Sequence, residues 1–129
     1  MARLPTLTQT LYADTSAQLT FELVDEQNQA LALETLETLT LTAYELESED
    51  ILNAREGQDV LNANDVTVVT DAGPPLVTTV SWLLTPADTA MLDPERTAEY
   101  HVAQFVWTWS GGTRRQAYAV QYAVEALAY

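Results

Sequence analysis

The feature that most constrains the fold of this chain is a pair of long alternating segments near its C-terminus. Within residues 98–110 apolar and aromatic side chains occupy every second position from 103 to 109, and within residues 113–127 they do so from 118 to 124, which is the period of a β-strand with one buried face. Gly111 and Gly112 join the two segments, and this dipeptide tolerates the positive φ angles of a tight hairpin turn. The sequence therefore predicts a long C-terminal β-hairpin. One face of the first strand is expected to carry His101, Ala103, Phe105, Trp107 and Trp109, and one face of the second Tyr118, Val120, Tyr122 and Val124.

Five further segments favour strands by their residue pattern, and polar or Gly- and Pro-containing turn sequences lie between several of them. Together with the hairpin they make about seven short strands, the number that builds an immunoglobulin-like domain of roughly 100 residues. We therefore expect an all-β protein, an immunoglobulin-like antiparallel β-sandwich. Residues 33–37 fit either a helical turn or an extended segment, and both readings stay open. The five segments are residues 7–12, 18–25, 38–46, 66–70 and 77–84.

One short helix is expected near residues 86–92. Thr85 can cap it, Pro86 suits the first helical position, and Asp88 would lie near the positive end of the helix dipole. Residues 48–64 are polar and predict a long excursion with at most one short helical or bridging turn. The apolar residues expected to hold this excursion to the body are Ile51, Leu52, Val60 and Leu61.

Length and composition indicate one domain. A chain of 129 residues, 47% of them apolar, is large enough for one hydrophobic core that folds without a metal ion. The absence of cysteine excludes disulfides, thiolate nucleophiles and thiolate metal sites. We expect residues 16–129 to form the sandwich, whereas residues 1–15 are either an N-terminal arm or the first strand.

The chain is strongly acidic, with 19 Asp and Glu residues against five basic residues and a formal net charge of −14. Nucleic acid is not an expected partner, because such binding depends on Lys and Arg side chains that neutralise phosphates. Most of the acids lie between Glu22 and Asp71, where Arg55 is the single basic residue. This region is either a solvated face or a surface that complements a basic protein partner.

The sequence also bears on location. Its N-terminal residues lack the apolar run of a secretory signal, and no stretch of about 18 apolar residues occurs anywhere in it. We therefore expect a protein that is made in the cytoplasm of its host cell and that has no membrane partner.

Residues that support catalysis are scarce. His101 is the only histidine, and its place in an apolar-rich strand favours a structural role. The sequence has no nucleophile elbow, no phosphate-binding glycine-rich loop and no paired-histidine metal motif. We expect a protein that is not an enzyme and that uses no cofactor.

Three acidic residues form a candidate surface in the acidic region. Strand alternation would place Glu45, Glu47 and Glu49 on one side, where carboxylate oxygens could contact a partner or hold Ca²⁺. Their spacing lacks the order of known calcium loops, so a solvated strand edge is the favoured explanation.

Two further pairs complete the candidate interface residues. Trp107 and Trp109 share one face of their strand, where they either line a groove for a sugar or peptide or belong to the core. Arg114 and Arg115 follow the glycine turn, where they either pair with nearby acids or form a positive tip for partner contacts.

Residues 19–127 resemble small immunoglobulin-like structural proteins of tailed bacteriophages and prophages. The segments that carry the resemblance are LTFELVDEQNQAL, DVLNANDVTV, WLLTPADTAML and EYHVAQFVWTWSGGTRRQAYAVQYAVEAL. The last of these looks like the closing hairpin of phage β-sandwich modules. The resemblance implies a virion component present in many symmetric copies, as a capsid decoration, a neck or collar part, or a tail or fibre adaptor.

The expected function is therefore structural. We expect a non-enzymatic virion protein that binds other virion proteins of the capsid, portal, neck or tail, that can also form homo-oligomers, and whose residues 1–15 can extend over a neighbour. The alternative is a recognition module that binds carbohydrate or a cell-surface protein, as part of a tail fibre or receptor-binding accessory.

Overall fold

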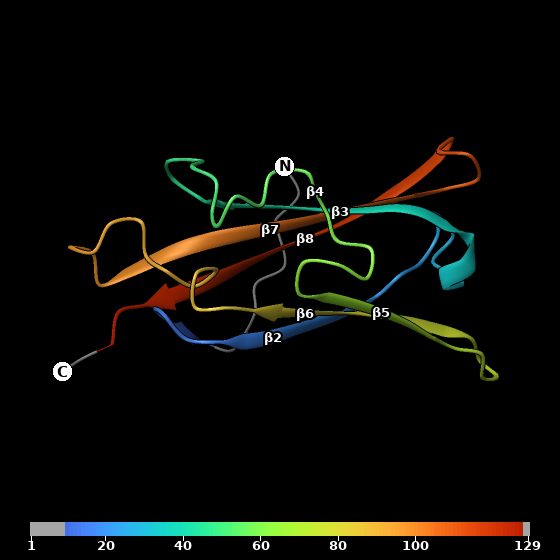
Figure 1. Ribbon diagram of the computed structural model, residues 1–129, viewed down its shortest axis with the longest axis horizontal. Coiled ribbons are helices and arrows are strands. Elements are labelled where there is room, and N and C mark those ends of the chain that lie inside the picture. Colours follow the sequence, from blue (N-terminus) through green and yellow to red (C-terminus); the bar gives the residue numbers. More distant parts are fainter. Residues whose placement is uncertain (1–9, 128–129) are drawn as a thin grey trace.

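The computed structural model describes residues 10–127, which form two β-sheets packed face to face (Figure 1). The larger sheet has five strands in the order β1-β8-β7-β3-β4, and the smaller sheet has three in the order β2-β6-β5. A single 3₁₀ turn, η1, precedes β3. The bounds are β1 Leu11–Tyr12, β2 Ala17–Glu22, η1 Leu33–Thr35, β3 Leu36–Glu45, β4 Gln58–Asp59, β5 Val66–Asp71, β6 Val77–Leu84, β7 Ala98–Trp109 and β8 Arg114–Glu125.

The strand order confirms the predicted immunoglobulin-like sandwich. The β2-β6-β5 and β3-β7-β8 sets follow the B-E-D and C-F-G orders of immunoglobulin domains. All neighbours are antiparallel except β1 and β8, where Leu11 is the parallel partner of Val124. In Figure 1, β3, β7 and β8 form the upper layer, and η1 lies at the same end of the sandwich as the β5–β6 and β7–β8 turns.

The C-terminal hairpin is confirmed in its strands, its turn and the residues that share a face. β7 and β8 pair from Ala98–Glu125 to Trp109–Arg114, and Gly111 and Gly112 have φ angles of 69° and 77°. The alternation in the sequence corresponds to burial in the structure, since every second side chain of β7 points between the sheets. The other predicted strands are also found, although residues 7–9 of the first lie outside the described residues.

The short helix expected near residues 86–92 is wrong, because this segment forms a turn and then irregular chain. The Asp88 N–H donates to the Thr85 carbonyl at 2.8 Å, and the Asp88 carboxylate accepts the Thr85 N–H at 2.8 Å. The Thr89 hydroxyl accepts the Thr15 N–H at 3.0 Å and donates to the Thr15 carbonyl at 2.7 Å, with a longer contact to the Pro86 carbonyl at 3.3 Å. Side-chain bonds to distant segments therefore hold the chain in a non-helical path.

The excursion of residues 48–64 is attached much as its sequence predicts. Leu52 and Val60 are buried, whereas Ile51 and Leu61 are partly buried. Ile51 makes one isolated bridge to Tyr44, and the two-residue strand β4 pairs with β3. The open question at residues 33–37 is answered by the 3₁₀ turn η1, which leads directly into β3.

Aromatic rings join the two sheets at the centre of the core. Phe21 of β2 contacts Phe105 of β7, with ring centroids 4.8 Å apart, and it also stacks on Tyr118 of β8 at 4.5 Å. Trp82 of β6 meets Phe105 edge-on at 5.7 Å. Antibody domains join their sheets by a disulfide between the strands equivalent to β2 and β7. This chain has no cysteine, and the contact between Phe21 and Phe105 joins the same two strands instead.

We predict that Trp107→Ala lowers the free energy of unfolding by about 3–5 kcal/mol, because it removes a large side chain from a packed core. The side chain is 1% exposed, and its indole N–H donates to the Val24 carbonyl at 3.0 Å. Urea denaturation followed by circular dichroism measures the change. Val69→Ala, at a side chain that is 59% exposed, is the control and should change stability by less than about 0.5 kcal/mol. An unchanged midpoint for Trp107→Ala would contradict the core assignment.

Candidate interaction surface

The tryptophan pair proposed from the sequence lies inside the protein. Trp107 and Trp109 are 1% and 4% exposed, and both belong to the hydrophobic cluster between the sheets. Of the two readings of the sequence, the structure supports the core. Neither ring is accessible to a sugar or a peptide.

The three glutamates do not share one side of a strand, because β3 ends at Glu45 and the chain turns there. Glu45 is 3% exposed, and its carboxylate accepts the N–H groups of Glu47 at 2.8 Å and Ser48 at 3.1 Å. Burial raises the pKa of Glu45, but these hydrogen bonds outweigh it and leave the pKa below its ordinary value. Glu45 therefore stabilises the turn, while Glu47 and Glu49 are exposed outside the strand.

The acidic groups do not form a metal site within residues 10–127. No cluster of three or more Asp, Glu, His or Cys side chains is placed to hold an ion in this part of the chain. Glu47 instead pairs with Arg96 at 2.9 Å, and both side chains are exposed.

The two arginines after the glycine turn have different surroundings. Arg114 forms an ion pair with Glu26, and its guanidinium lies 5.3 Å from the centre of the Trp109 ring. Arg115 is exposed on the outer side of β8 and forms no ion pair within the described residues. The pair is therefore one neutralised residue and one available cation.

His101 is buried and serves as a hydrogen-bond partner. It is 0% exposed, and its Nε2 lies 2.9 Å from a carboxylate oxygen of Glu99. Glu99 also accepts the N–H groups of Leu92 at 3.0 Å and Asp93 at 2.7 Å, so it fixes the connection between β6 and β7. Burial raises the pKa of Glu99, whereas the bonds from His101, Leu92 and Asp93 lower it below its ordinary value overall.

A second buried group, which the sequence analysis did not identify, surrounds Arg55. This side chain is 2% exposed, and its Nε and Nη2 atoms donate to the two oxygens of Asp88 at 2.6 and 3.0 Å. Its remaining donors reach Gln58 at 2.7 Å, the Asn64 carbonyl at 3.0 Å and Asp65 at 3.0 Å. Burial raises the pKa of Asp88, but bonds from Arg55 and its neighbours hold it below the ordinary value.

The Arg55 group is buried against the core, and its hydrogen-bonding groups are paired within the protein. The Arg55 guanidinium also lies 5.6 Å from the centre of the Trp82 ring, which places it against the core. Every donor of the guanidinium that is named above has an acceptor, and Asp88 further accepts the Asn53 amide at 2.9 Å. A saturated ion pair of this kind holds segments together and leaves no lone pair for acid–base chemistry. The only signal in the sequence is that Arg55 is a lone cation in an acidic region.

The outer side of the larger sheet is the most distinctive surface of the chain. Four consecutive outward rows carry no Asp, Glu, Arg or His on β3, β7 and β8, and we call this three-strand strip the charge-free face. Asp59 of the edge strand β4 borders the strip in the row of Thr40. Tyr100 is its most prominent side chain, at 49% exposure. The amide of Gln104 donates to the Tyr44 hydroxyl at 3.2 Å, which holds two of its polar groups in place. Its members are Thr40, Thr42, Tyr44, Tyr100, Val102, Gln104, Val106, Ala117, Ala119, Gln121 and Ala123. Val102 is 0% exposed, so the accessible part of the face is formed by the side chains around it.

The outer side of the smaller sheet is shorter and differs in charge. Val69 and Leu83 are 59% and 53% exposed there, among Thr and Ser side chains. Glu22 and Asp71 both lie at one end of this side, and the described strands β2, β5 and β6 place no Arg on it. The smaller sheet therefore presents a single sign of charge at one end.

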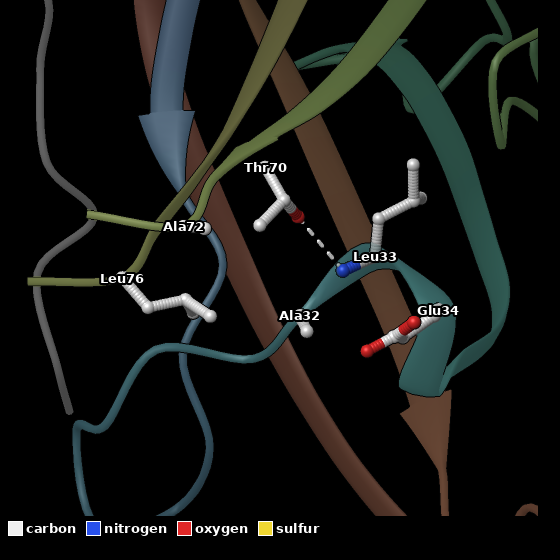
Figure 2. Close-up of a pocket in the computed structure, with 6 residues that line it drawn as sticks. All are labelled: Ala32, Leu33, Glu34, Thr70, Ala72 and Leu76. Carbon is white, nitrogen blue, oxygen red and sulfur yellow. Dashed lines mark hydrogen bonds between the residues drawn. The ribbon is translucent and has the colours of Figure 1, made fainter. Parts of the chain in front are cut away.

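An apolar pocket of about 430 Å³ opens at the η1 end of the sandwich (Figure 2). Leu33 and Leu76 approach it from opposite sides, and the Leu33 N–H donates to the Thr70 hydroxyl at 2.8 Å. Among residues 10–127, Glu34 is the one charged side chain at its rim. The lining residues are Ala32, Leu33, Glu34, Thr70, Ala72 and Leu76.

Comparisons with known proteins found no match for this chain, whether with family models, curated proteins or solved structures. Among residues 10–127, none of the helical structure has the length and apolar character that crossing a membrane requires. Function is therefore inferred from the surfaces and buried groups described above.

We predict that Asp88→Asn lowers the free energy of unfolding by about 3 kcal/mol, because it leaves the buried Arg55 without its charged partner. Asp65→Asn is the matched control. Asp65 also bonds Arg55, but it is 43% exposed, so its removal should cost less than about 1 kcal/mol. Urea denaturation at pH 7 measures both variants. Equal effects of the two substitutions would contradict the central role of Asp88.

We also predict that the protein loses stability in acid. Glu45, Asp88 and Glu99 all have pKa values below their ordinary values of 4.5, 3.8 and 4.5. A carboxylate with a lowered pKa in the folded state stabilises the fold above its ordinary pKa, and this contribution is lost as the pH falls through the lowered value. The free energy of unfolding should therefore decline below about pH 4.

Urea denaturation at a series of pH values tests this prediction. Exposed acids repel one another less in acid, which opposes the decline, so the comparison with Asp88→Asn isolates one buried group. The decline should be shallower in Asp88→Asn than in the unchanged chain. Parallel pH profiles of the two proteins would contradict the assignment.

Proposed function

We propose that this chain is a non-enzymatic structural protein of a tailed-bacteriophage particle that binds neighbouring virion proteins through its charge-free face. The observation that carries the proposal is the distribution of charge. The chain has a net charge of −14, yet the charge-free face on its three longest strands, β3, β7 and β8, carries no charged side chain. Burying charged groups is costly, and interface cores are accordingly poor in charge and rich in Tyr.

The buried polar groups support a non-enzymatic role. His101 has no exposed surface, and the carboxylates of Glu45, Asp88 and Glu99 each accept two or more hydrogen bonds from the protein itself. A general base must reach a substrate through a cleft, whereas these groups hold turns and connections in place.

The resemblance of residues 19–127 to immunoglobulin-like phage modules supports the virion setting. A decoration, collar or adaptor protein works through contacts repeated in many symmetric copies. A sandwich that presents the charge-free face of its larger sheet to its neighbours fits that role, because the contact requires no moving part and no cofactor.

The alternative function, a recognition module, has one observation in its favour. The apolar pocket between Leu33 and Leu76 has the size and lining of a site for an apolar group of a cell-surface protein. A carbohydrate ligand is less well served, because Trp107 and Trp109 are buried and cannot stack on a sugar ring.

Incorporation into particles tests the two functions against each other. Particles assembled from the genome that encodes this chain should contain it at a fixed ratio to the major capsid protein. Ala119→Arg places a charge at the centre of the charge-free face and should reduce incorporation at least about tenfold, since an unpaired buried charge costs several kcal/mol.

Ser81→Arg is the matched control, because it places the same side chain on the outer side of the smaller sheet. It should leave incorporation unchanged. Absence of the chain from particles, together with binding of the isolated protein to cells or glycans that Leu33→Lys abolishes, would replace the proposal by the recognition function.

A further inference from the structure

We propose that the occupant of the charge-free face is a second copy of this chain, in a dimer with two-fold symmetry. The inference rests on the proposed function and names the partner of the same surface. In this dimer the larger sheets stack face to face with their strands antiparallel, as two sheets pack in a β-sandwich. Two features of the face are self-complementary in this arrangement, one of charge and one of shape.

The first feature is a pair of opposite charges at the two ends of one strand. Arg115 and Glu125 both point outward from β8 and are exposed. They flank the charge-free rows, since Arg115 lies in the row of Thr108, next to the Ala117 row, and Glu125 lies one row beyond Ala123. Neither forms an ion pair within the described residues. One end of the face is therefore positive and the other negative.

A two-fold axis converts these ends into two ion pairs. In this dimer the axis lies between the stacked sheets, perpendicular to the strands and over the row of Val120. It places each row of one copy over the row of the other copy that lies equally far from Val120 on the opposite side. Arg115 and Glu125 are each five residues from Val120 along β8, so Arg115 of each copy faces Glu125 of the other. A two-fold interface repeats each contact twice, which doubles the effect of this match.

The same axis matches the shape of the face. Tyr100 lies in the row of Ala123, and Val106 lies in the row of Ala117. These two rows are also equally distant from Val120, so the exposed Tyr100 ring of one copy lies over Val106 of the other. The small side chain of Ala119, next to the axis, lets the sheets approach closely. Aromatic rings against β-branched side chains are favourable contacts in sheets.

The distribution of acids is compatible with this contact. The exposed glutamates and aspartates lie mainly in turns and at sheet edges, and Asp59 on the edge strand β4 is the one that borders the face within one of its rows. At an ionic strength of about 0.15 M, repulsion between charges further apart than about 8 Å is largely screened. The smaller sheet cannot form an equivalent dimer, because Glu22 and Asp71 at its one charged end have no arginine on that face to meet.

Sedimentation equilibrium of the full chain tests the dimer, at about 1 µM to 0.5 mM protein, a range that covers weak interfaces. The unchanged chain should show a reversible monomer–dimer equilibrium. Arg115→Glu and Glu125→Arg should each weaken it at least about tenfold, because each creates two like-charge contacts. The double variant Arg115→Glu/Glu125→Arg restores both pairs and should return the dissociation constant to within about threefold of the unchanged chain.

Cross-linking gives a second measurement that does not depend on charge. The chain has no cysteine, so Ala119→Cys introduces a single thiol near the axis. A short bismaleimide should link two copies through this thiol, and Ser81→Cys on the smaller sheet is the matched control that should stay unlinked. Both positions lie outside the core, and unchanged denaturation midpoints will verify folding.

The outcomes separate this inference from the function on which it rests. A chain that stays monomeric over the whole range overturns the dimer, and so does a double variant that fails to recover. If the chain is monomeric while Ala119→Arg still prevents incorporation into particles, the face binds a different virion protein and the proposed function stands. If the dimer forms but Ala119→Arg enters particles normally, the proposed function falls.

Discussion

The structure depends on the buried pairing of Arg55 with Asp88. Arg55 belongs to the irregular segment between β3 and β5, and Asp88 to the turn that follows β6, so the pair joins the connections of both sheets. The bidentate geometry, with further bonds to Gln58 and the Asn64 carbonyl, sets the path of the chain around β4 and into β5. Without it, two long segments that have little regular structure would have few reasons to adopt one conformation.

Buried carboxylates perform a related task elsewhere in the chain. Glu45 closes the turn after β3, and Glu99 fixes the connection that enters β7 while it also bonds His101. These groups place charge inside the loops, and exposed acids occupy the turns and edges. The strands are thereby free to present uncharged side chains outward as well as inward. This division of charge leaves β3, β7 and β8 without charged side chains in the rows of the charge-free face.

Much of the fold could be predicted from the sequence, whereas the candidate site could be predicted only in part. The strands were identified because alternation of residues such as Phe105 and Trp107 follows directly from the pleat of a strand. The prediction of a helix near Asp88 was wrong because that carboxylate bonds Arg55, which is distant in sequence, instead of supporting a local helix. The prediction that Glu45 and Glu47 share one side of a strand was wrong, because the position at which a strand ends depends on the turn that follows it.

By itself, the sequence determined that this chain is an all-β protein with a long C-terminal hairpin, with Trp107 and Trp109 on one strand face, and without cysteine chemistry. These properties are local or compositional, so they need no knowledge of the packing. Only the tertiary structure decided that this tryptophan face is the inner one and that Arg55 is buried. It also decided that outward residues of β3, β7 and β8 come together as the charge-free face. Which side chains are buried, and which share a surface, depends on which strands are neighbours in the sheets. Alternation along one strand does not reveal those neighbours, because they are distant in the sequence.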